Sequence, residues 1–135
     1  MKPSYSWQEK NILIVEDDDL SFIYVSEALK SFAPNITRCK SGLVAFFHCM
    51  SYPAPDLVLM DIKLPEMSGY DSTRLIKKFQ PGIPVLALTA CAMQDERNKC
   101  IMAGCDLYLP KPVMPHNLIN AIASFLNDSE YIDIR

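Results

Sequence analysis

The sequence lacks the features typical of membrane, secreted and nucleic-acid-binding proteins. No apolar run approaches the roughly 20 residues that cross a bilayer, and residues 1–12 contain charged side chains but no apolar signal-peptide region. Basic side chains are in the minority, with 13 Lys and Arg against 16 Asp and Glu, so the net charge is −3 and no broad basic surface is expected. These absences predict a cytoplasmic protein that contacts neither nucleic acid nor membrane directly.

Cysteine is present, but its spacing matches no Cys-x-x-Cys redox or zinc motif. The chain has 5 cysteines, an odd number, and no two of them are spaced Cys-x-x-Cys. Redox and zinc motifs with that spacing are therefore excluded. We interpret the cysteines as small buried hydrophobic residues in a reducing compartment. The length of 135 residues corresponds to a single domain.

Strand and helix patterns alternate along the chain. Short apolar runs predict strands at residues 11–15, 36–39, 57–60, 85–88 and 107–109. Helical spacing predicts helices at residues 20–32, 42–50, 70–79 and 93–102, and a last one from Pro115 onward. The apolar face of the first helix is expected to consist of Leu20, Ile23, Tyr24, Ala28, Leu29 and Phe32, and that of the second of Leu43, Phe46, Phe47 and Met50. Five alternating pairs indicate an α/β fold, a parallel sheet with helices on both faces.

Polar residues follow four of the predicted strands directly. Glu16 and Asp17 follow the first strand, Asp61 the third, Thr89 the fourth, and Lys111 comes just after the fifth. Each of these taken alone is compatible with a helix cap or a plain surface position. Because parallel strands joined by helices all end at the same edge of the sheet, the topology brings these side chains together.

This set of side chains suits phosphoryl chemistry. Clustered carboxylates repel each other, and a divalent cation removes that repulsion. Carboxylate oxygens with free water positions suit Mg²⁺. A carboxylate beside the metal can act as the nucleophile that forms an aspartyl phosphate. The metal and a lysine would neutralise the charge of the transferring group.

Four motifs, in this order and spacing, resemble the receiver domain of two-component response regulators. They lie at residues 12–18, 56–70, 84–90 and 103–112. The resemblance implies a flavodoxin-like, doubly wound five-stranded sheet of order 2-1-3-4-5. It covers residues 11–127, which leaves residues 1–10 as a leader or linker and residues 128–135 as a C-terminal tail.

The resemblance also implies a role for each site residue. Asp61 matches the phosphoacceptor. Glu16 and Asp17 match the acidic pair that holds Mg²⁺, and the backbone carbonyl of Lys63 would complete the metal site. Thr89 matches the hydroxyl that contacts the phosphoryl group, and Lys111 the phosphate-contacting lysine, with a cis bond expected between Lys111 and Pro112.

A conformational switch and partners are implied as well. Tyr108 matches an aromatic switch position that works with Thr89, and the responding surface would be the fourth helix, fifth strand and fifth helix, residues 93–127. The expected partner is a histidine kinase or a histidine phosphotransfer domain, with a homodimer through the same surface as a further prediction. Such a domain catalyses its own phosphorylation and dephosphorylation without being a turnover enzyme.

The leader bears on where the domain comes from. Residues 5–10 are similar to the linker before the terminal receiver of hybrid sensor histidine kinases. They favour an excised receiver, whose parent would be a histidine kinase, over a single-domain regulator.

Three other classes of protein share either the aspartyl phosphate or the fold class. A haloacid-dehalogenase-type phosphatase needs a second Asp where Lys63 stands and is rejected. A flavodoxin-like electron carrier needs a phosphate-binding loop where residues 16–19 are all acidic, and they would repel a phosphate. A pseudo-receiver, an interaction module independent of phosphorylation, stays as the alternative.

Overall fold

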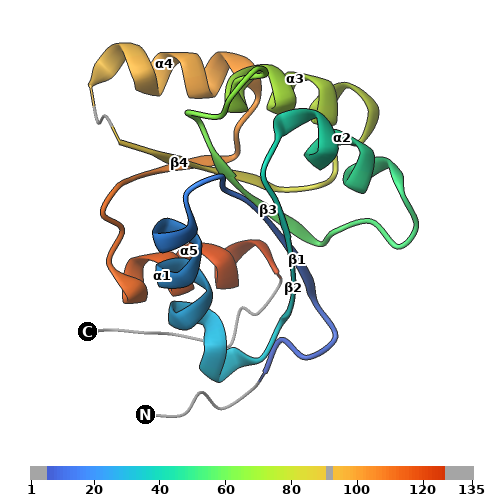
Figure 1. Cartoon of the computed structure of the whole chain (residues 1–135), viewed down its shortest axis with the longest axis vertical. Coiled ribbons are helices and arrows are strands. Elements are labelled where there is room, and N and C mark those ends of the chain that lie inside the picture. Colours follow the sequence, from blue (N-terminus) through green and yellow to red (C-terminus); the bar gives the residue numbers. More distant parts are fainter. Residues whose placement is uncertain (1–5, 91–92, 127–135) are drawn as a thin grey trace.

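A five-stranded parallel sheet forms the centre of the molecule (Figure 1). The computed structural model describes residues 6–90 and 93–126. The strand order is β2-β1-β3-β4-β5, as the resemblance implies. The strands are β1 (Asn11–Val15), β2 (Asn35–Cys39), β3 (Leu57–Asp61), β4 (Val85–Thr89) and β5 (Leu107–Pro110). The helices are α1 (Asp19–Leu29), α2 (Gly42–Met50), α3 (Gly69–Phe79), α4 (Gln94–Ala103) and α5 (Pro115–Phe125), with a 3-10 turn, η1 (Lys30–Phe32), after α1.

Alternate residues of the central strands supply two cores, one on each face of the sheet. Ile12 and Ile14 of β1 pack in the core that α1 and α5 cover, and Leu13 and Val15 pack in the core under α2 and α3. This arrangement explains why the central strands are continuous apolar runs, since a parallel sheet is covered on both sides. A smaller cluster around Cys100 joins α4 to the sheet.

Side-chain caps set the start of three helices. Asp18 accepts a hydrogen bond from the Ser21 amide at 2.8 Å at the start of α1, and Ser41 accepts one from the Val44 amide at 3.0 Å at the start of α2. Ser68 does the same for α3. The predicted first helix was too long, because its last turn, from Lys30 to Phe32, tightens into the 3-10 turn. The other predicted boundaries agree with the structure to within one residue.

The apolar face predicted for the first helix is buried only toward its C-terminal end, and the face predicted for α2 is mostly exposed. Val25 and Leu29 of α1 are buried, whereas Leu20 is 76% exposed. In α2 the buried residues are small: Gly42, Ala45 and Cys49. Leu43, Phe47 and Met50 are exposed, and Phe46 is partly buried. Close packing of α2 on α3 favours small residues at the contact, where Ser72 donates to the Gly42 carbonyl at 2.7 Å.

The cysteines within the described ranges behave as buried hydrophobic residues. Cys39, Cys49 and Cys100 are buried free thiols and Cys105 is half-buried; Cys91 lies outside the described residues. Burial raises the pKa of Cys39 to about 11 and that of Cys49 to about 12, so both thiols stay protonated at neutral pH. Across residues 6–90 and 93–126, none of the helices has both the length and the apolar character required to span a bilayer.

Candidate functional site

The carboxyl edge of the sheet brings together the acidic and basic side chains predicted from the sequence. Glu16 follows β1, Asp61 and Thr89 are the last residues of β3 and β4, and Lys111 follows β5. Glu16, Asp61 and Thr89 are buried. The peptide bond between Lys111 and Pro112 is cis, as expected.

Lys111 joins two carboxylates across this edge. Its Nζ lies 2.9 Å from Glu16 Oε1 and 3.4 Å from Asp61 Oδ1. The second oxygen of Glu16 accepts a hydrogen bond from the Asp18 amide at 3.2 Å. Glu16 is thus held at both oxygens, and it fixes the lysine directly beside Asp61.

Three carboxylates are close enough to share one metal ion. Glu16, Asp17 and Asp61 each offer an oxygen, and these oxygens lie within 4.8 Å of one another. Asp17 is exposed, so a metal held there would keep water ligands. A set of hard oxygen donors open on one side fits Mg²⁺, which uses a few carboxylates and retains several waters.

The loop after Asp61 is held against the strand that carries it. The Lys63 amide donates to Asp61 Oδ1 at 3.3 Å, and the Gly69 amide donates to the Ile62 carbonyl at 2.9 Å. A Cβ at Gly69 would lie 2.3 Å from the Asp61 carbonyl oxygen, so only glycine allows this return of the chain. The amide of Lys63 was not anticipated, since the sequence pointed only to its carbonyl as a metal ligand. The side chain of Lys63 is exposed.

The clustered carboxylates repel each other when no cation is bound, and this repulsion changes the pKa of Asp61. Burial and the neighbouring Glu16 raise the pKa of Asp61 to about 7, and Lys111 offsets part of this rise. Burial acts against the charge of Lys111, but Glu16 and Asp61 prevail and raise the pKa of its ammonium. The two acidic neighbours therefore favour the charged form of Lys111.

The raised pKa of Asp61 predicts that the stability of the metal-free protein depends on pH. A carboxyl whose pKa rises on folding holds its proton more tightly in the folded chain, so stability falls as pH increases between the unfolded and folded values. The free energy of unfolding should therefore fall between pH 3.8 and about 7, with a slope approaching about 1.4 kcal/mol per pH unit. Denaturant unfolding in a chelator, compared with an Asp61→Asn variant, isolates this contribution. Parallel pH profiles for the two proteins would contradict it.

Tyr108 packs beside α4. Its half-buried ring packs in the cluster with Ile62, Ala87 and Cys100, and the Arg97 guanidinium of α4 lies 5.7 Å from the ring centroid. β4, which carries Thr89, is the direct neighbour of β5, which carries Tyr108. The predicted switch residues are therefore on adjacent strands, one at the site and one under α4.

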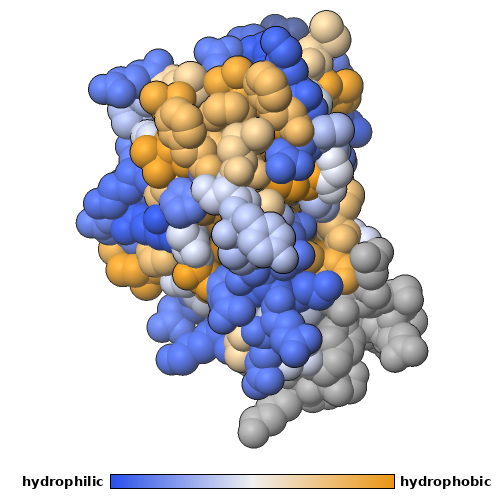
Figure 2. Space-filling model, turned by 90° about the vertical axis from the view of Figure 1, so that its right-hand side faces the viewer, coloured by the Kyte–Doolittle hydropathy of each residue, from blue (hydrophilic) through white to orange (hydrophobic). Residues whose placement is uncertain are grey.

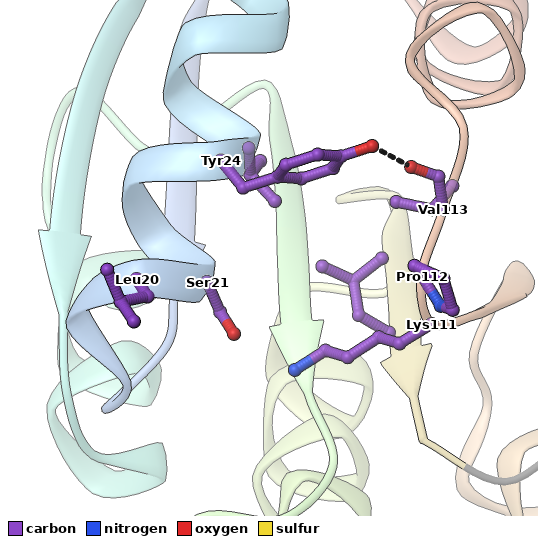
Figure 3. A pocket seen from close by; sticks show the side chains of 8 residues that line it. Leu20, Ser21, Tyr24, Lys111, Pro112 and Val113 are labelled. Atoms are coloured by element: carbon purple, nitrogen blue, oxygen red, sulfur yellow. Dashed lines mark hydrogen bonds between the residues drawn. The ribbon is translucent and has the colours of Figure 1, made fainter.

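A groove beside Lys111 was not predicted. It has a volume of about 360 Å³ and lies between α1 and the segment after β5 (Figure 3). The Tyr24 hydroxyl closes one end by donating to the Val113 carbonyl at 2.9 Å. The sequence places Tyr24 on an apolar helix face, but a tyrosine hydroxyl that packs against the protein generally needs an acceptor, and that requirement was the available signal.

Comparisons with known proteins agree with this geometry. The profile of the response regulator receiver domain family matches residues 12–123. The polar-differentiation response regulator DivK of Brucella ovis is 35% identical over 122 residues, which cover 89% of this chain and 98% of DivK.

Two solved structures are similar in fold and sequence. One is the receiver domain of the sensor histidine kinase PA1611 from Pseudomonas aeruginosa PAO1, with a magnesium ion coordinated in its active site cleft. Its TM-score is 0.81 and its sequence identity 31%, and the match covers 87% of this chain and 98% of that one. The other is the BeF3-activated DrrB receiver domain, with a TM-score of 0.78 and 30% identity over 90% of this chain and 98% of that one.

Proposed function

Because the chain belongs to the response regulator receiver domain family of two-component signalling, we propose that it takes a phosphoryl group from a phosphohistidine onto Asp61. The observation that carries the proposal is the position of Asp61, buried beside Glu16 and within 3.4 Å of the Lys111 ammonium. Asp61 is also close enough to Asp17 to share a cation with it.

The chain's own groups account for the transfer. A carboxylate oxygen of Asp61 attacks phosphorus, the bond from phosphorus to the donor imidazole nitrogen breaks, and the bonding electron pair stays on that nitrogen. Lys111 balances charge on the phosphoryl oxygens, and the Thr89 hydroxyl donates a hydrogen bond to one of them. Mg²⁺ held by Asp17, Asp61 and the Lys63 carbonyl, with Glu16 in support, would neutralise the remaining negative charge.

Phosphoryl uptake from a small donor tests this proposal. Incubation of the protein with acetyl phosphate and Mg²⁺ should add the mass of one phosphoryl group, detected by intact-protein mass spectrometry. A chelator should prevent the gain. No gain with Mg²⁺ present would instead favour a pseudo-receiver, a reading that the complete set of acidic, hydroxyl and lysine groups argues against.

Mg²⁺ affinity should depend strongly on Asp17. Asp17→Ala removes one carboxylate from the cluster, so affinity should fall at least about tenfold, while the metal-free fold becomes slightly more stable or stays unchanged because repulsion is relieved. Calorimetric titration measures the affinity. Asp19→Ala is the matched control, since Asp19 pairs with Arg38 at 2.8 Å and lies outside the cluster. Equal affinities for wild type and Asp17→Ala would remove this site from consideration.

The groove beside Lys111 supports a protein phosphodonor. Leu20 and Tyr24 of α1, which line one side, are 76% and 45% exposed. In Figure 3 the Lys111 side chain extends across the space between α1 and the opposite wall. A histidine kinase or histidine phosphotransfer domain that presents its phosphohistidine to Asp61 must cover this edge, and the apolar rim offers it a contact surface.

Phosphorylation is proposed to change the surface formed by α4, β5 and α5. A phosphoryl group on Asp61 would draw Thr89 toward it, and Tyr108 would turn into the vacated space. In α4 only Cys100 and Ala103 are buried, so few buried side chains oppose a shift of this helix.

Amide exchange with and without beryllofluoride should show this change. Protection is expected to differ in residues 93–126; Asn127, the last residue of the predicted surface, lies outside the described residues. The control is the same experiment on Asp61→Asn, in which beryllofluoride should have no effect. Changes limited to the loops around Asp61 would make the domain a phosphate relay or sink.

Two predictions remain tied to these proposals. A cytoplasmic location is proposed because the expected phosphodonors act there. The origin as an excised receiver of a hybrid kinase stays a prediction, since the similar proteins include both a response regulator and a sensor kinase receiver.

A further inference from the structure

The outer face of α2 exposes an unusual number of large hydrophobic side chains. Leu43, Val44, Phe47 and Met50 are all more than two-fifths exposed, and Phe79 at the end of α3 is 51% exposed. We call these five residues the α2 face. The Phe46 ring links them, with centroids 5.5 Å from Phe47 and 5.8 Å from Phe79. Figure 2 shows hydrophobic side chains gathered on this side of the molecule. A contiguous apolar patch of this kind marks an interaction surface.

We propose that the α2 face binds the α2 face of a second copy of this chain, forming a two-fold symmetric dimer. Leu43, Phe47 and Met50 follow at i, i+4 and i+7, the spacing with which one helix packs along another. α2 contains no Asp, Glu, Lys or Arg. Two copies of this stripe can therefore meet without opposing like charges or burying an unpaired one.

Charges beside the α2 face favour an antiparallel arrangement. α3 runs alongside α2 in the same direction, since Gly42 contacts Ser72 near the start of α3 and Phe46 contacts Phe79 at its end. Asp71, paired with Arg74, is exposed in the first turn of α3, and Lys78 is exposed in the last turn. A two-fold axis across the helices places the start of α3 in one copy opposite its end in the other, so Asp71 faces Lys78. The macrodipoles of the paired helices also oppose each other favourably.

This dimer leaves the groove beside Lys111, which α1 lines, on the other side of the sheet from the interface. The α2 face lies on the opposite side of the sheet from the core covered by α1 and α5. It is also separate from the surface of α4, β5 and α5, through which a homodimer was predicted from the sequence. The two dimer surfaces can therefore be distinguished by substitution.

Sedimentation equilibrium of the whole chain, from low micromolar to near-millimolar concentration, tests the proposal. The average mass should rise from one chain toward two. Phe47→Glu should weaken association at least about 100-fold, because it places a charge at the centre of both apolar faces. Ile101→Glu, the same change at a 63% exposed position of α4, should leave association unchanged. Circular dichroism confirms folding, and Leu43→Glu provides a second variant at another position of the stripe.

A charge exchange tests the orientation. Lys78→Asp should weaken the dimer, and combining it with Asp71→Lys should restore association. Failure of the double variant to restore it would overturn the antiparallel arrangement. Monomeric mass at every concentration, or loss of association in Ile101→Glu but not in Phe47→Glu, would overturn the α2 dimer.

Discussion

Asp61→Asn should abolish phosphoryl uptake from acetyl phosphate. The amide is nearly the same size as the carboxylate, but it is a much weaker nucleophile and cannot form a stable acyl phosphate. It also removes the negative charge of one of the three carboxylates whose oxygens lie within 4.8 Å of one another at the metal site. The expected mass gain is therefore zero under conditions in which the wild type gains one phosphoryl group.

The control for this experiment is Asp56, which directly precedes β3, the strand that ends at Asp61. Asp56→Asn makes the same chemical change just before β3, at the opposite edge of the sheet, where Asp56 accepts a hydrogen bond from the Asn11 amide at 2.7 Å. Uptake by Asp56→Asn should match the wild type. Equal uptake by Asp61→Asn and wild type would show that the phosphoacceptor is another residue.

Trp7→Ala should be the most destabilising of the single substitutions considered. Trp7 is 1% exposed, stacks on Phe32 with ring centroids 4.3 Å apart, and belongs to the core under α1 and α5. Truncating a buried tryptophan to alanine costs about 3–5 kcal/mol, which corresponds to a fall in Tm of roughly 10–20 °C for a domain of this size. Thermal unfolding followed by circular dichroism measures the loss, because the chain has 1 Trp and the variant has no tryptophan fluorescence.

Two controls separate burial from general effects of substitution. Tyr52→Ala removes an aromatic ring that is 99% exposed and should change Tm very little. Trp7→Phe keeps a ring against Phe32 and should cost less than Trp7→Ala; within the described ranges Trp7 Nε1 has no hydrogen-bond acceptor to lose. A Trp7→Ala variant as stable as Tyr52→Ala would mean that residues 1–10 are a linker, as the sequence suggested. Because Trp7 is buried in the core, we propose that the folded unit includes it, although the sequence placed it in the leader.

The sequence predicted the α/β class and the residues of the site because both depend on local patterns. Each buried strand is a short apolar run followed at once by a polar residue, as at Asp61 and Thr89. In a parallel sheet this pattern alone is enough to place those residues at one edge. The capping residues Asp18 and Ser41 are equally local signals, since each side chain bonds a backbone amide three residues further on.

Other features were decided only by contacts between distant segments. The periodicity of α2 marks an apolar stripe but does not say which side meets α3; that was settled by the close fit of Gly42 against Ser72, which requires small residues at the contact. From the sequence alone, Trp7 belongs to a polar leader. In the fold its ring is buried against Phe32 and the core beneath α5. The Tyr24 hydroxyl finds its acceptor 89 residues away. Sequence periodicity reports which residues share a face, whereas burial of that face depends on the shape and size of the partner that the fold brings to it.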